Sequence, residues 1–223
     1  MNKLNHTKNL FLSISFCVAL FLFILSFSIS LPIYCRQFYY AHIDCLELDM
    51  VSGFTKTQIT EAYDAVLDYL TVPNKEFSAG AMKYSLEGKL HFADCKALVT
   101  LNSTVLLISA ICILVLLCLK KAKKAGPFLI GRRHASFYSA VAAILFPLIT
   151  GILAAINFDS AFEIFHKLFF PGKENWIFDP ATDEIILVLP QEFFMNCAIL
   201  IGAAILIFSG ILLLYQLCKK RTD

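Results

Sequence analysis

The sequence predicts an α-helical integral membrane protein with four transmembrane helices. Of its 223 residues, 58% are hydrophobic and only 16% are charged. Four segments free of charged residues are each about 20 residues or longer, the length that a helix needs to cross a bilayer core of roughly 30 Å. Most of the acidic residues lie between these segments. This composition is too apolar for a soluble domain.

The four predicted helices span residues 9–33, 99–119, 135–157 and 194–217. A short N-terminal segment within residues 1–33 precedes the first helix, and a tail of residues 218–223 follows the last. The first helix begins after a basic segment, as a signal peptide does. Its apolar stretch is too long for one, and no small-x-small cleavage pattern follows it, so we expect an uncleaved anchor.

Lysine and arginine predict the orientation. They gather before the first helix, in the loop 120–134 and in the tail 218–223. With four helices these clusters lie on one side, and the positive-inside rule predicts that both termini are cytoplasmic. Residues 34–98 and 158–193 are then extracellular. We interpret the basic runs as topology signals, and with a net charge of +2 no nucleic-acid partner is expected.

Residues 34–98 are predicted to form a small α+β domain. Thr55 and Gln58 have the spacing of a helix capping box. An apolar stripe at helical spacing follows, formed by Ile59, Ala62, Tyr63, Val66, Leu67 and Leu70. Residues 76–89 contain two glycines and are typical of a short strand or a loop.

Residues 158–193 are predicted to form an interfacial helix followed by a loop. Asp159 is the expected N-cap of a helix over residues 160–169. One face of that helix carries Phe162, Phe165, His166 and Phe169. An aromatic face just beyond a span is typical of a helix lying at the membrane surface.

His91 and His166 are the candidate catalytic residues. Both fall just outside a predicted span, on the predicted extracellular side. Histidine suits proton transfer near neutral pH because its ordinary pKa is about 6.5. Asp94 lies one turn after His91 and is expected to bond its imidazole. Taken alone, a histidine on an apolar face such as His166 is more often structural.

Several other classes of site are not indicated. The sequence has no serine nucleophile elbow, no zinc-protease motif and no phosphate-binding glycine loop. The spans lack the buried charges of an ion-coupled transporter. The eight cysteines, including Cys35, Cys45 and Cys95 on the predicted outer side, show no redox or metal spacing. We expect no metal and no cofactor; a metal site formed by His42, His91, His166 and outer carboxylates lacks supporting ligand spacing.

Two motifs carry a family resemblance. Residues 90–95 read Leu-His-Phe-x-Asp-Cys and lead into the second span. Residues 162–183 read Phe-Glu-Ile-Phe-His-Lys-Leu-Phe-Phe-Pro-Gly-x-x-x-Trp-x-Phe-Asp-Pro-x-Thr-Asp. With the four-span layout, nearly the whole chain resembles the bacterial lipoprotein intramolecular transacylase (Lit) family.

The resemblance implies an acyltransferase at the outer face of the plasma membrane of a Gram-positive bacterium. Its partners would be membrane lipid and diacylglyceryl-modified lipoproteins. The implied reaction moves the sn-2 acyl chain of the diacylglyceryl group to the α-amine of the N-terminal cysteine, giving a lyso-form lipoprotein. His91 is expected as general base and His166 as acid or oxyanion partner, with no acyl-enzyme, although the two roles are nearly interchangeable.

Supporting roles fall to six further residues. Asp94 is expected to orient His91. Arg36, Tyr84 and Trp176 are expected to line a headgroup pocket, and Asp179 and Asp183 to hold the second outer loop in shape. The rival interpretation is a non-enzymatic accessory or sensor protein whose outer domain binds a partner.

Overall fold

The structure, a computed structural model, describes the backbone of residues 3–220. Within that range it describes all side chains except those of residues 3–5, 146, 150, 153–155, 219 and 220. The chain divides into two compact units. The first comprises Met1–Ile29, Ser103–Ile152 and Ile201–Asp223. The second comprises Ser30–Asn102 and Leu153–Leu200.

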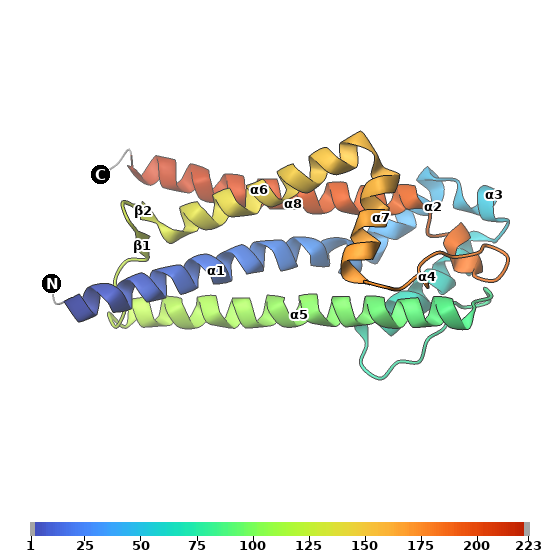
Figure 1. Ribbon diagram of the computed structural model, residues 1–223, viewed down its shortest axis with the longest axis horizontal. Helices are drawn as coiled ribbons and strands as arrows, with labels where there is room; N and C mark the ends of the chain where they lie inside the picture. Colours follow the sequence, from blue (N-terminus) through green and yellow to red (C-terminus); the bar gives the residue numbers. More distant parts are fainter. Residues whose placement is uncertain (1–2, 221–223) are drawn as a thin grey trace. The chain divides into compact units, whose positions relative to one another are not determined.

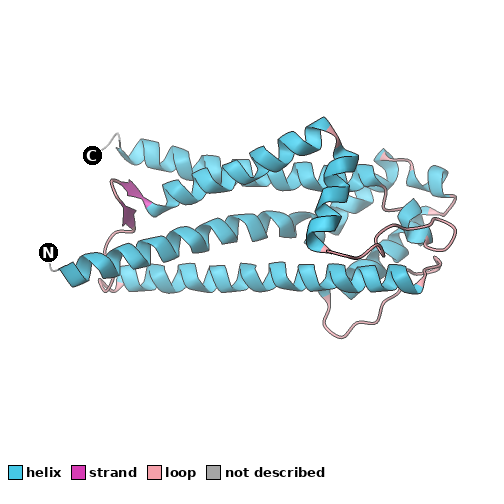
Figure 2. Cartoon of the chain, viewed as in Figure 1, coloured by secondary structure: helices cyan, strands magenta, loops and turns pink. Residues whose placement is uncertain are grey.

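The fold is almost entirely helical (Figures 1 and 2). Its helices, in chain order, are α1 (Lys3–Tyr34), α2 (Arg36–Cys45), α3 (Leu48–Ser52), α4 (Lys56–Thr71), α5 (Leu86–Lys121), α6 (Ala135–Ile156), α7 (Phe158–Phe169), the 3₁₀ turn η1 (Glu184–Leu187) and α8 (Gln191–Lys220). The described strands are β1 (Leu129–Ile130) and β2 (Arg133–His134), paired antiparallel with Leu129 opposite His134.

Three described helices are long and apolar enough to cross a membrane: His6–Tyr34, Leu86–Lys121 and Gln191–Cys218. They contain three of the four predicted spans. The predicted span 135–157 corresponds to α6, an apolar helix of 22 residues, some of whose side chains lie outside the described set. Its role as a fourth span stays a prediction. So does the orientation, and the Arg221 end of the last basic cluster lies outside the described residues.

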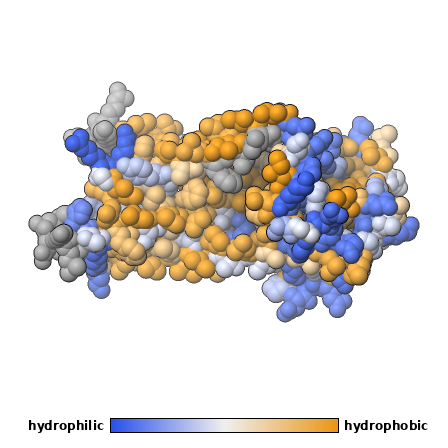
Figure 3. Space-filling model, in the orientation of Figure 1, coloured by the Kyte–Doolittle hydropathy of each residue, from blue (hydrophilic) through white to orange (hydrophobic). Residues whose placement is uncertain are grey.

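Aromatic stacking and a serine hydrogen bond connect the elements of the first unit. Phe16 of α1 stacks on the buried Phe128, with ring centroids 4.6 Å apart. The Ser139 hydroxyl of α6 donates to the Cys17 carbonyl oxygen at 2.9 Å, which joins α6 to α1. Exposed apolar side chains cover the outside of these helices, and the face seen in Figure 3 is hydrophobic over them. Such an exterior suits lipid rather than water as the surrounding medium.

The second unit has a conventional buried core. Tyr39 of α2 is fully buried, stacks on Tyr63 of α4 at 3.7 Å, and donates its hydroxyl to the Val188 carbonyl oxygen at 2.6 Å. The predicted stripe of α4 packs inward as expected, with Leu70 at its margin. The Thr55–Gln58 capping box is also confirmed. These contacts fix α2, α4 and the chain before α8 as one body.

Two expectations for the outer segments were wrong. Between α1 and α5 the described chain forms α2, α3, α4 and loops, so the predicted α+β domain is helical; the strand pair lies instead in the 120–134 loop. The N-cap of α7 is Asn157, whose side chain accepts from the Ser160 amide at 2.9 Å. Asp159 instead accepts a hydrogen bond from Gln191 at 2.6 Å. Both residues favour caps, and the sequence alone does not rank them.

Candidate active site

His91 lies in the part of α5 that precedes the predicted span. The 36 residues of α5 give a helix of about 54 Å at a rise of roughly 1.5 Å per residue, well beyond a bilayer core of about 30 Å. Its first turns carry Glu87, Lys89 and Asp94, whereas residues 99–119 carry no charge. His91 therefore lies in the polar first turns of α5, before its charge-free stretch.

His166 lies on α7, in the same unit as His91. The Asn157 cap starts this helix immediately after α6. His166 is buried, whereas Phe165 and Phe169, expected on the same face, are about half exposed. Leu168 is 70% exposed. The helix thus buries its histidine and presents apolar side chains outward, as an interfacial helix does.

The two imidazoles lie close together. Their ring centroids are 5.6 Å apart and the ring planes are tilted by 34°. Only 7% of His91 and 6% of His166 is exposed. The structure therefore brings together two histidines that are 75 positions apart in the chain, from residue 91 to residue 166.

Aromatic rings enclose the histidine pair. Trp176 stacks on His166 with centroids 4.6 Å apart. Phe170 and Phe178 meet the edge or face of His91 at 5.0 and 5.5 Å. Rings of this kind keep water from the imidazoles and hold their planes.

Burial keeps both histidines neutral. It lowers the pKa of His91 to about 4, with a further contribution from the neighbouring His166. Burial also lowers the pKa of His166, partly offset by a hydrogen bond to the Phe162 carbonyl. Two cations at this separation, out of water, would be strongly disfavoured. Each ring at neutral pH therefore has one N–H and one lone pair.

The hydrogen bonds of each ring show which of its nitrogens already has a partner. Nδ1 of His166 lies 2.8 Å from the Phe162 carbonyl oxygen, and because that oxygen only accepts, Nδ1 is the donor. Nε2 of His91 lies 3.4 Å from Sγ of Cys95. Nδ1 of His91 is buried and has no hydrogen-bond partner among the described residues.

Asp94 does not bond His91 as expected. Its carboxylate accepts from Nζ of Lys173 at 2.5 Å and from Nδ2 of Asn175 at 3.2 Å. Its charge still acts on His91, whose pKa it tends to raise, while Lys173 tends to lower it. Trp176 in turn donates its indole N–H to the Lys173 carbonyl oxygen at 3.0 Å. Asp94 thus joins α5 to the loop that carries Trp176, whose indole ring stacks on His166.

Asp183 fastens the same loop at its other end. It is 4% exposed, and its Oδ1 accepts from the backbone amide of Ser85, the residue before α5. A Cβ added at Gly88 would lie 2.2 Å from this oxygen. The expectation that Asp183 shapes the second outer loop is consistent with this contact, which also anchors the start of α5.

Three other predicted residues lie in other surroundings. Arg36 forms ion pairs with Asp64 and Asp68 of α4. Tyr84 is 43% exposed and packs edge-on against Phe77. Asp179 closes a turn, where its Oδ1 accepts from the Ala181 amide at 2.9 Å. None of these described contacts involves either histidine.

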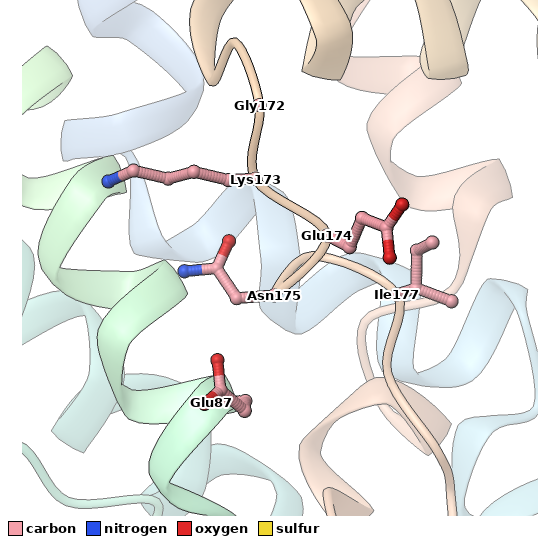
Figure 4. A pocket seen from close by; sticks show the side chains of 6 residues that line it. All are labelled: Glu87, Gly172, Lys173, Glu174, Asn175 and Ile177. Atoms are coloured by element: carbon pink, nitrogen blue, oxygen red, sulfur yellow. The ribbon is translucent and has the colours of Figure 1, made fainter.

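A pocket of about 470 Å³ lies beside the contact between Asp94 and its loop partners; its lining residues are Glu87, Gly172, Lys173, Glu174, Asn175 and Ile177. In Figure 4, Lys173 and Asn175 extend from the loop toward α5, and Glu174 points to the opposite side. The histidines are not among the lining residues, so the pocket is a neighbouring surface hollow. It shares Lys173 and Asn175 with the Asp94 contact.

Sequence reasoning did not identify Cys95, Lys173 or Asn175 as neighbours of the site. Helical spacing alone could have indicated Cys95, because it lies four residues after His91. Lys173 and Asn175 carried no local signal, since their partner Asp94 is 79 and 81 positions away in the chain, respectively. Within residues 3–220, no three histidine, cysteine or acidic side chains come together as metal ligands would.

Comparisons with known proteins identify the family to which the chain is similar. Residues 14–194 match the family described as lipoprotein intramolecular transacylase Lit. Among solved structures, the chain is similar to the membrane integral lipoprotein intramolecular transacylase Lit from Bacillus cereus, with 28% identity and a TM-score of 0.85, covering 98% of this chain and 100% of that one.

Two variants of the Bacillus cereus protein also match. One has a histidine replaced by alanine (26% identity, TM-score 0.79, covering 98% of this chain and 97% of that one). The other has a histidine replaced by arginine (27% identity, TM-score 0.78, covering 97% and 95%). No curated protein sequence matches. The family match covers most of the chain and confirms the resemblance of the two motifs. The chain belongs to the lipoprotein intramolecular transacylase (Lit) family of membrane-integral acyltransferases.

Proposed function

We propose that this protein moves the sn-2 acyl chain of a diacylglyceryl-modified lipoprotein to the α-amine of its N-terminal cysteine. The product is a lyso-form lipoprotein. The observation that carries the proposal is the buried pair of neutral imidazoles, 5.6 Å apart, in a chain of this family. Such a pair supplies acid/base chemistry without a protein nucleophile, as a transfer within one substrate requires.

His166 acts as the general base. Its Nδ1 proton is held by the Phe162 carbonyl oxygen, so its Nε2 retains a lone pair. Burial lowers the pKa of His166, so this lone pair is available at neutral pH. The order of roles is then opposite to the one first expected from the sequence, in which His91 was the base.

His91 acts as the hydrogen-bond donor to the developing oxyanion. Burial lowers its pKa to about 4, so it is a neutral imidazole at neutral pH. A neutral N–H in an apolar surround polarises a carbonyl effectively. Its unbonded, buried Nδ1 is the candidate donor.

The atoms balance within one substrate molecule. The neutral α-amine attacks the sn-2 ester carbonyl carbon, so a C–N bond forms and the oxygen becomes an oxyanion facing His91. His166 takes the proton from the attacking nitrogen and passes it to the glycerol oxygen as the C–O bond breaks. Acid/base help of this kind contributes about 10²–10⁴-fold. Well-oriented intramolecular partners reach effective molarities of roughly 10⁵–10⁸ M.

We place this reaction at the extracellular face of the plasma membrane of a Gram-positive bacterium, with both termini cytoplasmic. The outward apolar side chains of α7, Phe165, Leu168 and Phe169, rest in the outer leaflet and keep His166 at headgroup height. Acyl chains then reach the histidine pair from the lipid side, and the lipoprotein peptide leaves toward water.

We assign positioning roles to three further residues. Asp94 holds Lys173 and Asn175, Trp176 stacks on His166, and Asp183 anchors the loop to α5. Arg36, Tyr84 and Asp179 support the second unit away from the reacting groups.

The test is mass spectrometry of the N-terminal lipopeptide of a diacylated reporter lipoprotein, co-expressed in a host without N-acyltransferase. Wild type is expected to shift one acyl chain from glycerol to the amine with no change in total mass. His91→Gln and His166→Gln are expected to abolish the shift while inserting normally.

His42→Gln is the matched control. His42 also bonds the carbonyl four residues earlier, at 2.6 Å, yet it lies outside the pair. It is expected to retain activity. An unmodified reporter beside well-inserted wild-type protein contradicts the proposal and supports the non-enzymatic accessory or sensor alternative.

A further inference from the structure

Cys95 has a contact that the reaction above leaves unassigned. It follows His91 by one helical turn on α5, and its Sγ lies 3.4 Å from His91 Nε2. Cys95 is a free thiol. Among the cysteines with a described hydrogen bond, it is the one whose bond is to an imidazole of the histidine pair.

The thiol of Cys95 is a proton donor at neutral pH. Burial, together with the negative charge of Asp94, raises the pKa of Cys95 to about 12. The sulfur therefore keeps its hydrogen and is a poor nucleophile. A protonated thiol can donate to the lone pair of a neighbouring imidazole nitrogen, and we take the contact between Cys95 and His91 in this direction.

The tautomer of His91 follows from this contact. A neutral imidazole carries one proton, so a ring that accepts at Nε2 carries its proton on Nδ1. Nδ1 of His91 is buried and without a partner among the described residues. An N–H in that position is an unsatisfied donor, which a ligand oxygen would satisfy.

We propose, building on the function proposed above, that Cys95 is a positioning residue that fixes His91 in the Nδ1–H tautomer. The hydrogen bond from Sγ–H to Nε2 leaves the Nδ1 proton free for the oxyanion of the substrate. His166, whose Nδ1 proton is held by a carbonyl, offers the complementary lone pair. The Cys95 thiol thus leaves His91 as a hydrogen-bond donor, and the Phe162 carbonyl leaves His166 as a proton acceptor.

None of the other described charged or titratable groups around His91 has a described hydrogen bond to its ring nitrogens. Asp94, on the same helix, is bonded to Lys173 and Asn175 of the facing loop. From α7, the facing titratable group is His166, whose ring is tilted 34° to His91 rather than bonded through a described contact. The remaining ring neighbours of His91 are the phenyl groups of Phe92, Phe170 and Phe178, which carry no charge.

The test combines imidazole ¹⁵N NMR with turnover of the reporter lipopeptide, using the full-length protein in detergent micelles. The His91 signals are identified by their loss in His91→Gln. In wild type they are expected to show Nδ1 protonated and Nε2 as acceptor. Cys95→Ala is expected to move the proton to Nε2 and to lower kcat about 10- to 100-fold, as loss of an orienting partner does, with KM unchanged.

Cys95→Ser keeps a small donor and is expected to restore both the tautomer and most of kcat. Cys45→Ala, which removes an exposed cysteine of the same unit, is expected to change neither. A wild-type His91 protonated at Nε2, or a Cys95→Ala kcat within about twofold of wild type, overturns the proposal.

Failure of this inference is distinguishable from failure of the proposed function. If wild type converts the reporter and needs both histidines, but Cys95→Ala is fully active, only the role of Cys95 is lost. If wild type converts no reporter while the NMR signals show the Nδ1–H tautomer, the proposed function fails instead. A merely structural cysteine would lower folded yield without moving the tautomer.

Discussion

At the scale of single residues, burial sets the pH range in which the histidine pair works. It lowers the pKa of His91 to about 4 and also lowers that of His166. His91 therefore stays neutral well below the ordinary histidine value of about 6.5, and the pKa of His166 also lies below that value. The account needs this state, because one ring must accept a proton and the other must donate while uncharged.

The pH dependence of kcat follows from these pKa values. As pH falls, protonation of the substrate α-amine is expected to lower kcat near its ordinary pKa of about 7.7–8.0, and protonation of His166 is expected to lower it again only below about 6.5. The measurement is reporter turnover at saturating substrate across pH, fitted with one limb for the amine and one for His166. A His166 limb at or above the ordinary histidine value of about 6.5 would contradict a buried neutral base.

The same residues link pH to stability. Between about pH 6.5 and the lowered pKa values of the folded state, the two histidines bind protons in the unfolded chain but not in the folded protein. The free energy of unfolding is therefore expected to fall on acidification. Above about pH 6.5 their contribution is fully present. Thermal unfolding in detergent measures this, and the pH dependence of wild type is expected to weaken in His91→Gln.

The contact of Asp94 is a second residue-scale determinant. Asp94→Asn is expected to lower kcat roughly 10- to 100-fold, because the loop carrying Trp176 loses its anchor to α5. Glu163→Gln is the control, since Glu163 forms an ion pair of equal length, 2.5 Å, with Lys167 on the exposed side of α7. Equal losses in both variants, measured by reporter turnover, would contradict the positioning role.

At the scale of elements, the contacts at the start of α5 determine the position of His91. Asp183 accepts from the amide before the helix, and Gly88 leaves room for that carboxylate. Ser85 is the N-cap of the helix, its Oγ accepting from the Gly88 amide at 2.9 Å, and a cap of this kind contributes about 0.5–2 kcal/mol to stability. Because Asp183, which holds the backbone amide of this cap, belongs to the second outer loop, its contact joins the two segments that carry the histidines.

Gly88→Ala tests this arrangement. The added methyl group would lie 2.2 Å from Asp183 Oδ1, so the carboxylate must shift and the cap weaken. We expect a lower melting temperature and reduced turnover. Gly210→Ala in α8 is the control, because nothing lies within 4 Å of its added Cβ. A variant at position 88 as stable and active as this control would contradict the proposed cap.

Elements with a local signal were predictable from the sequence. The capping box and stripe of α4, three long apolar helices and the helix carrying His166 all rest on short-range spacing. For residues 76–89 the sequence left a short strand or a loop open; residues 76–85 form a loop, fixed by long-range contacts such as Ser85 with Asp183, and residues 86–89 begin α5. The partners of Asp94 were missed for the same reason.

At the scale of the whole molecule, the chain combines a lipid-compatible unit with one that has a water-soluble type of core. The first unit exposes apolar side chains, and the second buries a cluster around Tyr39, Tyr63 and Phe193. With four spans, the two outer segments follow the first and the third span. The positive-inside pattern then predicts that both outer segments, and therefore both histidines, lie on the same side.

Cysteine labelling tests this topology. Cys45 and Cys218 are both exposed thiols, one in the first outer segment and one at the end of α8. In single-cysteine variants on intact cells, an impermeant maleimide is expected to label Cys45 at once and Cys218 only after permeabilisation. Labelling of Cys218 in intact cells would contradict cytoplasmic termini.

The central claim is that the acyl chain moves within one lipoprotein molecule. The most direct measurement uses a purified reporter lipopeptide carrying a deuterated acyl chain only at sn-2, in micelles containing unlabelled phospholipid. The account predicts that the deuterated chain appears on the α-amine, at unchanged total mass, with wild type and not with His91→Gln or His166→Gln. An unlabelled chain on the amine, or a gain in mass, would show transfer from another lipid and contradict it.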